Sequence, residues 1–181
     1  MIIEETGIEG LVLLTPRVFS DERGAFSETF NQKEFEAIAG KSVAFLQDNE
    51  SVSHKNVLRG LHFQLPPAAQ GKLVRVIKGA VLDVAVDLRK DSDTYGKHFS
   101  VHLSGENKKQ FWIPEGFAHG FLSLENETVF AYKCTAYYSP EHERTIAWND
   151  PDLAVDWGIN DPVISAKDMK SSDFYTFDSP F

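Results

Sequence analysis

The sequence predicts an all-β fold, an antiparallel β-barrel or jelly roll with short peripheral helices. Short runs rich in β-branched and aromatic residues recur between turn residues, whereas helical periodicity is weak. The expected strands are Leu11 to Leu14, Leu73 to Ile77, Val81 to Leu88, Phe99 to Leu103 and Thr128 to Tyr138. A chain of 181 residues, 42% hydrophobic, can bury one substantial core but is short for two. We therefore expect a single domain over residues 1–181.

The expected strand from Val81 to Leu88 has the clearest alternation of polarity. One side would carry Leu82, Val84, Val86 and Leu88, and the other would carry Asp83, Ala85 and Asp87. The strand therefore has one apolar face and one face with carboxylates.

Helical signal is limited to a short segment near Gln32 to Ile38 and a turn that begins at Ser139. Residues after about Asp161 contain serine, proline and aspartate without a periodic pattern. We expect an irregular tail from about residue 161, packed on a barrel made by the rest of the chain.

Composition limits the location and the partners of the protein. Cys134 is the single cysteine, so an intramolecular disulfide is excluded, and the first residues lack the basic and apolar regions of a signal peptide. These features favour the cytoplasm. No stretch approaches the roughly 20 apolar residues that cross a bilayer. A net charge of −9 argues against nucleic acid or an anionic membrane as a partner, so cations that bind an anionic ligand must cluster locally.

Polar groups stand among apolar residues in three segments: Val57 to Gln64, Ile113 to Phe121 and Tyr132 to Tyr138. In a regular strand Tyr132 and Tyr138 would point to one side with small residues between them, which leaves room for a ligand. An aromatic stripe that fills a core is an equally open interpretation. Arg59 and His62 would fall on opposite faces of a straight strand, and a bulge or twist at Gly60 would bring them together. Taken alone, such a histidine is more often a hydrogen-bonded core residue than a base.

Eight blocks of sequence, taken together and in this order, form a pattern that is specific enough to indicate a protein family. They are Arg23 to Phe30, Gln47 to Asn49, Arg59 to Gln64, Gln70 to Val76, Asp83 to Asp87, Pro114 to Phe121, Tyr132 to Tyr138 and Trp148 to Ala154. They resemble the dTDP-4-dehydrorhamnose 3,5-epimerases, and the likeness covers about residues 8–168. It implies a homodimeric, cupin-type barrel without a cofactor. The implied reaction epimerises C3 and C5 of dTDP-4-dehydro-6-deoxy-D-glucose to give dTDP-4-dehydro-L-rhamnose, a step of dTDP-L-rhamnose biosynthesis.

The resemblance also implies a role for individual residues. The catalytic set would be His62 as base, Asp168 as its carboxylate partner, Tyr132 as acid, and Lys72. The substrate contacts would be Arg23, Glu28, Gln47, Asp48, Asn49, Arg59, Lys72, His119, Glu143 and Lys167, with Tyr138 stacked on the thymine. The chain departs from the family pattern at Asp93, which often is proline there, and from Met169 onward.

The chemistry of this reaction fits the implied catalytic residues. A ketone at C4 acidifies the hydrogens at C3 and C5, so epimerisation needs a base, a stabiliser of the enolate oxygen and an acid on the opposite face. Imidazole titrates near neutral pH, and a buried Asp168 would fix the tautomer of His62. Lys72 would stabilise the charge that develops on O4. Tyr132 would deliver a proton from the far side.

The remaining polar residues would orient groups and bind the nucleotide. Lys72 would be helped by His119, which we expect Asp83 to orient. Arg23, Arg59 and Lys167 would hold the diphosphate by charge-assisted hydrogen bonds, although each of these cations alone could equally be an ordinary solvated surface residue.

A metal site is one alternative for a β-barrel that carries histidines. Metal-binding cupins typically present His-x-His followed by Glu and a later His, whereas His62 is followed by Phe63 and Gln64. One or two imidazoles close a transition-metal site poorly, so we expect no metal. The other histidines, His54, His98, His102 and His142, lack ligand spacing and are expected in ordinary surface or loop positions.

Two further alternatives remain open at this stage. The first is an epimerase that inverts a single carbon of a related nucleotide 4-keto sugar. The second is a barrel that binds sugars without catalysis, although such a binder would have no use for an acid–base pair.

Overall fold

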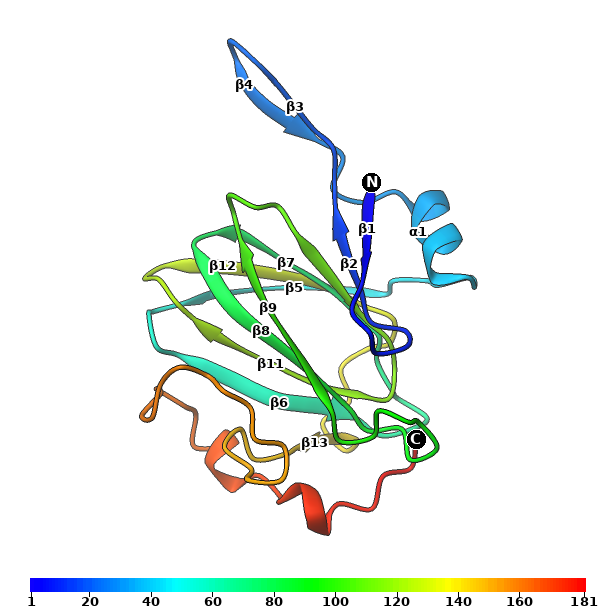
Figure 1. Cartoon of the computed structure of the whole chain (residues 1–181), viewed down its shortest axis with the longest axis vertical. Coiled ribbons are helices and arrows are strands. Elements are labelled where there is room, and N and C mark those ends of the chain that lie inside the picture. The colour runs from blue at the N-terminus through cyan, green and yellow to red at the C-terminus, as the bar shows by residue number, and fades with distance from the viewer.

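The computed structural model describes residues 1–181 and contains thirteen strands and one α-helix (Figure 1). The six-stranded sheet consists, in spatial order, of β1 (Ile2–Glu5), β2 (Val12–Thr15), β10 (Gln110–Ile113), β7 (Lys72–Lys78), β12 (Thr128–Cys134) and β5 (Gln47–Ser53). The five-stranded sheet consists of β13 (Glu143–Thr145), β6 (Leu58–Gln64), β11 (Phe117–Ser123), β8 (Ala80–Asp87) and β9 (His98–Ser104). All strand pairs in both sheets are antiparallel. The predicted all-β jelly roll is confirmed.

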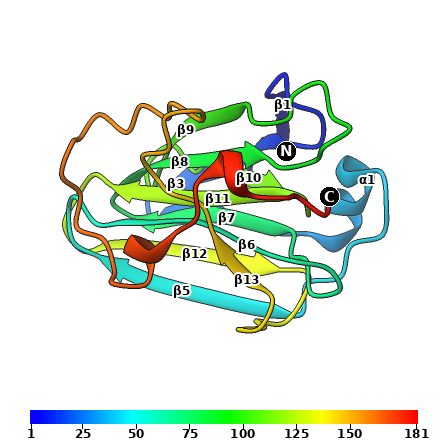
Figure 2. The same ribbon diagram turned by 90° about the horizontal axis from the view of Figure 1, so that it is seen from below.

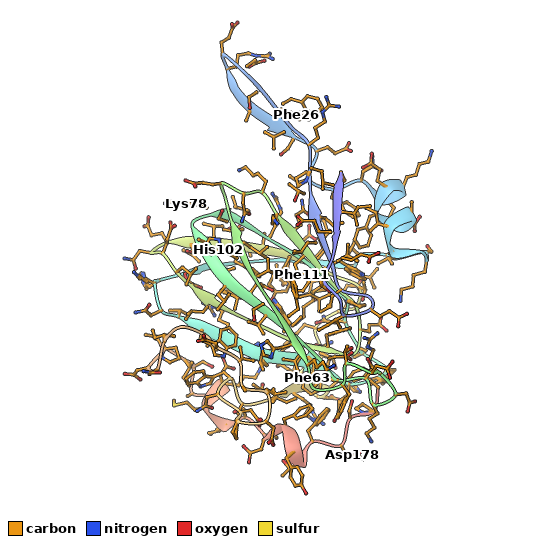
Figure 3. All side chains as sticks on the ribbon, in the orientation of Figure 1. Phe26, Phe63, Lys78, His102, Phe111 and Asp178 are labelled. Atoms are coloured by element: carbon orange, nitrogen blue, oxygen red, sulfur yellow. The ribbon has the colours of Figure 1, made fainter.

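The main core lies between the two sheets. Phe111 and Phe130 are fully buried there, and Phe111 is labelled in Figure 3. Burial of a side chain of this size contributes roughly 1.5–3 kcal/mol to folding. The predicted alternation of β8 places Val81 and Ala85 in this core and Val84 in a second one on the outer side of the sheet. Both faces of β8 are therefore buried, including the face that carries carboxylates.

The helix predicted near Gln32 to Ile38 is confirmed as α1 (Gln32–Ala39). The side chain of Asn31 caps its N-terminus by accepting a hydrogen bond from the backbone of Glu34. Gly40 ends the helix in the left-handed conformation that glycine adopts without strain.

The strand predicted from Thr128 to Tyr138 is wrong at its C-terminal end. β12 stops at Cys134, which pairs with the first residue of β5, Gln47, and the first residue of β7, Lys72. Both neighbouring strands begin at this level, and beyond it the pairing is limited to single backbone hydrogen bonds, from Thr135 to the carbonyl oxygen of Gly71 and from Leu46 to that of Cys134. Residues 135–139 therefore form an irregular segment.

The segment after residue 161 covers the outer face of the five-stranded sheet (Figure 2). Its regular structure is limited to two 3₁₀ turns, η1 (Asp168–Lys170) and η2 (Phe174–Thr176). Phe177 packs edge-on against Phe63 of β6 at 5.0 Å between ring centroids, and Phe63 lies between barrel and tail in Figure 3. This packing holds the tail close to β6. No helix in the structure has the length and apolar character that a membrane span requires.

A two-stranded arm projects from the barrel (Figure 1). It consists of β3 (Val18–Asp21) and β4 (Gly24–Ser27) and is almost entirely exposed. Phe26, labelled at the arm in Figure 3, is 68% exposed. The arm therefore leaves aromatic surface uncovered.

Asp87, fully buried at the end of β8, is expected to stabilise the fold strongly. Its carboxylate accepts hydrogen bonds from Arg89, Ser92 and Thr94 at 2.7–2.9 Å. Burial raises the pKa of Asp87, but these hydrogen bonds lower it by more, so the pKa lies below its ordinary value. We expect Asp87→Asn to reduce the free energy of unfolding by about 3 kcal/mol at pH 7, as measured by urea denaturation.

The pH dependence of that loss provides the control. A carboxyl with a depressed folded-state pKa contributes stability above its unfolded pKa of about 4. This contribution disappears as the pH falls through the lower folded-state pKa. The difference between wild type and Asp87→Asn should be constant from pH 5 to 7 and shrink below about pH 4. A difference that persists unchanged in acid would contradict the role of the ionised carboxylate.

Candidate active site

A cavity of about 530 Å³ opens between the two sheets. Its walls come from β5 and β12 on one sheet, from β6 and β11 on the other, and from residues 163–168 of the tail. The polar residues in its lining are Ser51, Arg59, His62, Lys72, His119, Tyr132, Tyr138, Glu143, Ser165, Lys167 and Asp168. The cavity therefore gathers most of the site residues that the sequence analysis implied.

His62 and Asp168 form a hydrogen-bonded pair inside this cavity. Nε2 of His62 lies 2.7 Å from Oδ1 of Asp168, which η1 delivers from the tail. Burial raises the pKa of Asp168, but hydrogen bonds from His62, Ser165 and the backbone of Gly60 lower it by more. The carboxylate therefore stays charged and accepts the Nε2 proton. Nδ1 is left as the nitrogen with a free lone pair.

The predicted bulge at Gly60 is present in β6. His62 pairs with His119 and Arg59 with Phe121, so β6 has one residue more than β11 in this interval. The inserted residue changes the side to which the strand aims its side chains. A Cβ atom at position 60 would lie 2.5 Å from the backbone of Gly120, so only glycine fits. Arg59 and His62 consequently line the same cavity.

Lys72 and His119 form the inner wall beside His62. Nζ of Lys72 lies 3.4 Å from the carbonyl oxygen of His62. Nε2 of His119 lies 3.0 and 3.1 Å from the two oxygens of the fully buried Asp83, the pairing that the sequence analysis expected. Burial lowers the pKa of His119, so its ring is neutral at pH 7, and burial also lowers the pKa of Lys72.

Tyr132 faces the cavity from the sheet opposite His62. Burial raises the pKa of its phenol, which therefore keeps its proton at neutral pH. Phe130, two residues earlier on β12, stacks on Phe121 of β11 with 4.1 Å between ring centroids. These two rings make an apolar wall beside the polar groups. A phenol and an imidazole thus lie on opposite sides of one ligand-sized space.

Tyr138 reaches the cavity from the irregular segment after β12 and not from the strand. The expectation that one regular strand carries both Tyr132 and Tyr138 is therefore wrong, although both side chains line the cavity. The Tyr138 hydroxyl donates to Oε2 of Glu143 at 2.6 Å, which raises the pKa of Tyr138. Lys167 pairs with the same carboxylate and lies 5.9 Å from the Tyr138 ring centroid. This rim combines an exposed aromatic face with a cation.

Several implied substrate contacts lie elsewhere in the structure. Arg23 pairs with Asp21 on the arm and has a side chain that is 86% exposed, and Glu28 accepts a hydrogen bond from Asn31. Asp48 pairs with Lys133, because alternation along β5 turns it away from the cavity. Arg23, Glu28 and Asp48 do not line the main cavity.

Gln47 and Asn49 line a smaller cavity of about 250 Å³ that shares His62, Lys72 and Tyr132 with the main one. The sequence analysis missed Ser51, the next residue on the same face of β5. Its hydroxyl is buried, has no hydrogen-bond partner and lines the main cavity. The sequence did contain a signal for Ser51, since alternate residues of a strand share one face and Ser51 follows Gln47 and Asn49 in that series.

No group of three or more His, Cys, Asp and Glu side chains is placed to hold a metal ion. Gln64, which stands where metal-binding cupins have a ligand, bonds to backbone groups through both ends of its amide. That the protein works without a metal stays a prediction.

A jelly-roll barrel with a hydrogen-bonded His–Asp pair facing a tyrosine across the cavity defines a cupin-type protein with a polar, ligand-sized site. A family model described as dTDP-4-dehydrorhamnose 3,5-epimerase matches residues 5–175. The enzyme of that name from Salmonella typhimurium strain LT2 is 54% identical over 169 residues, which cover 93% of this chain and 92% of that protein. The chain belongs to the dTDP-4-dehydrorhamnose 3,5-epimerase family. The predicted family and enzyme class, an epimerase, are confirmed.

Solved structures of sugar-nucleotide epimerases are also similar to this chain. The dTDP-6-deoxy-D-glucose-3,5-epimerase of Legionella pneumophila Philadelphia 1, in complex with dTDP-4-keto-L-rhamnose, has a TM-score of 0.94 and 49% identity. The alignment covers 98% of this chain and 94% of that one. A 3'-monoepimerase from Streptomyces bikiniensis, in complex with dTDP-quinovose, has a TM-score of 0.89 and 33% identity over 94% of this chain and 86% of that one.

Proposed function

We propose that this protein epimerises C3 and C5 of dTDP-4-dehydro-6-deoxy-D-glucose to give dTDP-4-dehydro-L-rhamnose, in dTDP-L-rhamnose biosynthesis. The observation that carries the proposal is the position of His62 and Tyr132, which face one cavity from opposite sheets. Inversion of a carbon requires removal of a proton from one face and delivery of a proton to the other. A substrate between these two side chains would meet both groups.

In the proposed mechanism Nδ1 of His62 removes the proton from C3 or C5. The electrons of the broken C–H bond move into the ring and onto O4, which gives an enolate. Asp168, at 2.7 Å, stabilises the imidazolium that forms. Because Asp168 keeps its charge, this stabilisation is available throughout the neutral range of pH.

The enolate oxygen would be stabilised by the ammonium group of Lys72, with His119 beside it. Lys72 is held by the carbonyl oxygen of His62, and Asp83 fixes the ring of His119. Tyr132 then donates its proton to the opposite face of the carbon, which completes the inversion. Tyr132 regains a proton and His62 loses one by exchange with water, so the protein returns to its initial state.

The nucleotide would occupy the outer part of the cavity. Arg59, whose Nε donates to Ser53 at 3.2 Å, and Lys167 on the rim would bind the diphosphate by charge-assisted hydrogen bonds. The half-exposed ring of Tyr138 would stack on the thymine. Such a cluster of cations lets an acidic protein bind a dianion.

An assay in D₂O with dTDP-4-dehydro-6-deoxy-D-glucose tests the proposal. We expect deuterium at both C3 and C5, formation of dTDP-4-dehydro-L-rhamnose and no loss of rate after exhaustive chelation. Labelling of C3 alone would favour the single-carbon epimerase, the reaction class of the Streptomyces bikiniensis relative. An unchanged substrate would favour the non-catalytic sugar-binding barrel. A chelated enzyme that one divalent ion restores would contradict the metal-free mechanism.

We further propose that the protein acts as a homodimer; its location in the cytoplasm stays a prediction. The arm supports a dimer, because Val18, Phe19 and Phe26 are 41–68% exposed on it and a second copy would cover them. The arm also carries Arg23 away from the cavity of its own subunit. If Arg23 binds diphosphate, it does so in the cavity of the second copy.

Replacement of Phe26 by aspartate tests the dimer. We expect Phe26→Asp to lower the mass measured by light scattering from twice 20.3 kDa to 20.3 kDa, because a charge would be buried in the interface. KM should rise in the same variant as Arg23 leaves the second site. Tyr175→Asp is the matched control, since Tyr175 is 87% exposed on the tail. A dimeric Phe26→Asp protein, or a monomer with unchanged KM, would contradict the proposal.

A further inference from the structure

Residues 136–139, which carry Tyr138, are held by side chains and not by a strand ladder. Gln70 donates to the carbonyl oxygen of Ala136 at 2.8 Å, and Gln47 accepts from the backbone N–H of Tyr138 at 2.9 Å. Gln47 is the first residue of β5, and Gln70 lies just before β7. The position of the backbone that carries Tyr138 therefore depends on these amide contacts.

Gln64 makes the largest share of these contacts. Its Nε2 donates to the carbonyl oxygens of Tyr137 at 3.2 Å and Ala68 at 2.6 Å, and its Oε1 accepts from the backbone N–H of Ser139 at 2.8 Å. The two residues that flank Tyr138 are thus bound by a single side chain. Gln64 is 4% exposed, so its own amide group depends on these partners for its hydrogen bonds.

We propose that Gln64 is a positioning residue for nucleotide binding, which acts by fixing the backbone on both sides of Tyr138. This inference rests on the proposed function, in which Tyr138 stacks on the thymine. The side chain that stands where a metal-binding cupin has a ligand would here preorganise an aromatic surface for the base. The Gln64 side chain bonds only to the backbone of Ala68, Tyr137 and Ser139 and to none of the groups assigned to proton transfer, so Gln64 should affect affinity and not the chemical step.

Gln64→Glu is the sharpest substitution because it keeps the shape of the side chain. The new carboxylate would face the carbonyl oxygens of Ala68 and Tyr137, which accept hydrogen bonds and cannot donate them. We expect KM for the nucleotide sugar and Kd for dTDP to rise about tenfold, within the range for loss of base–aromatic stacking. The value of kcat should stay within about twofold, because uniform binding is lost without a change in the transition state.

A double-mutant cycle with Tyr138→Ala separates positioning from general damage to β6. In the Tyr138→Ala background, Gln64→Glu should change Kd for dTDP by less than about twofold, because the ring that it positions is gone. Gln64→Met, which buries no carboxylate, repeats the test if Gln64→Glu folds poorly. Gln32→Glu is the control, since Gln32 holds the carbonyl oxygen of Val43 near α1, away from the cavity.

The outcomes distinguish this inference from the function on which it rests. If Tyr138→Ala binds dTDP as the wild type does, the role of Tyr138 in the proposed function fails. If Tyr138→Ala weakens binding but Gln64→Glu does not, the positioning role of Gln64 alone is wrong. A fall in kcat at unchanged KM, or a tenfold loss that persists in the Tyr138→Ala background, would likewise overturn it.

Discussion

His62→Ala is expected to abolish exchange of hydrogen with solvent at both C3 and C5. No other group in the cavity is expected to replace the base: burial lowers the pKa of His119, which makes its ring a weaker base, and Lys72 would have to lose the charge assigned to stabilising the enolate. Loss of a positioned base costs roughly 10²- to 10⁴-fold in rate. NMR spectra recorded in D₂O would follow both carbons of the substrate in one experiment.

Asp168→Asn provides a second test of the same role. Its amide can donate a hydrogen bond to Nε2 of His62, which would move the imidazole proton to Nδ1 and remove the lone pair that acts as base. We expect a loss of rate comparable with that of His62→Ala and little change in Kd for dTDP. Exchange at the wild-type rate in His62→Ala would show that the base is another residue.

One part of the site could be predicted from local sequence pattern, namely from the alternation of side-chain direction in strands and from the glycine at position 60. Arg59 and His62 would point to opposite faces of a regular strand, and the sequence predicted that a bulge or twist at Gly60 brings them together; the structure has a bulge there. That inference needed no knowledge of the fold, because an extra residue in one strand changes the side-chain direction in a fixed way. The polarity of β8 could also be predicted locally, because successive side chains of a strand point to opposite faces.

The end of β12 could not be read from its own residues. Residues 135–138 continue the alternation of Tyr132 and Cys134, so their pattern favours a strand. The ladder stops because β5 and β7 both begin at the level of Cys134, a fact set by segments far away in the sequence. Tertiary pairing overrides local preference in such places.

The carboxylate partner of His62 had no local signal at all. Asp168 lies 106 residues away, in a tail without periodicity, and only the resemblance to a family pointed to it. The structure supplies the physical reason for its position, since the tail packs on β6 through Phe63 and Phe177. Contacts of this range depend on packing and cannot be derived from spacing.

Tyr132→Phe separates removal of a proton from inversion. The variant loses a single oxygen from a partly buried ring that packs against Phe130 at 6.0 Å between centroids, so the fold should be retained. His62 and Lys72 remain, so the enolate still forms, and deuterium from solvent should enter at one carbon at least. His62 would return the deuteron to the face from which the proton left.

Inversion in Tyr132→Phe should fall by roughly 10²-fold or more, because no acid remains on the opposite face of the ring. The diagnostic quantity is the ratio of deuterium exchange to product formation, which should rise above that of the wild type. Tyr175→Phe removes the same oxygen from a tyrosine that is 87% exposed on the tail, and it should leave this ratio unchanged. Full double epimerisation by Tyr132→Phe at the wild-type rate would assign the acid to a different residue, with Ser51 and water in the cavity as the next candidates.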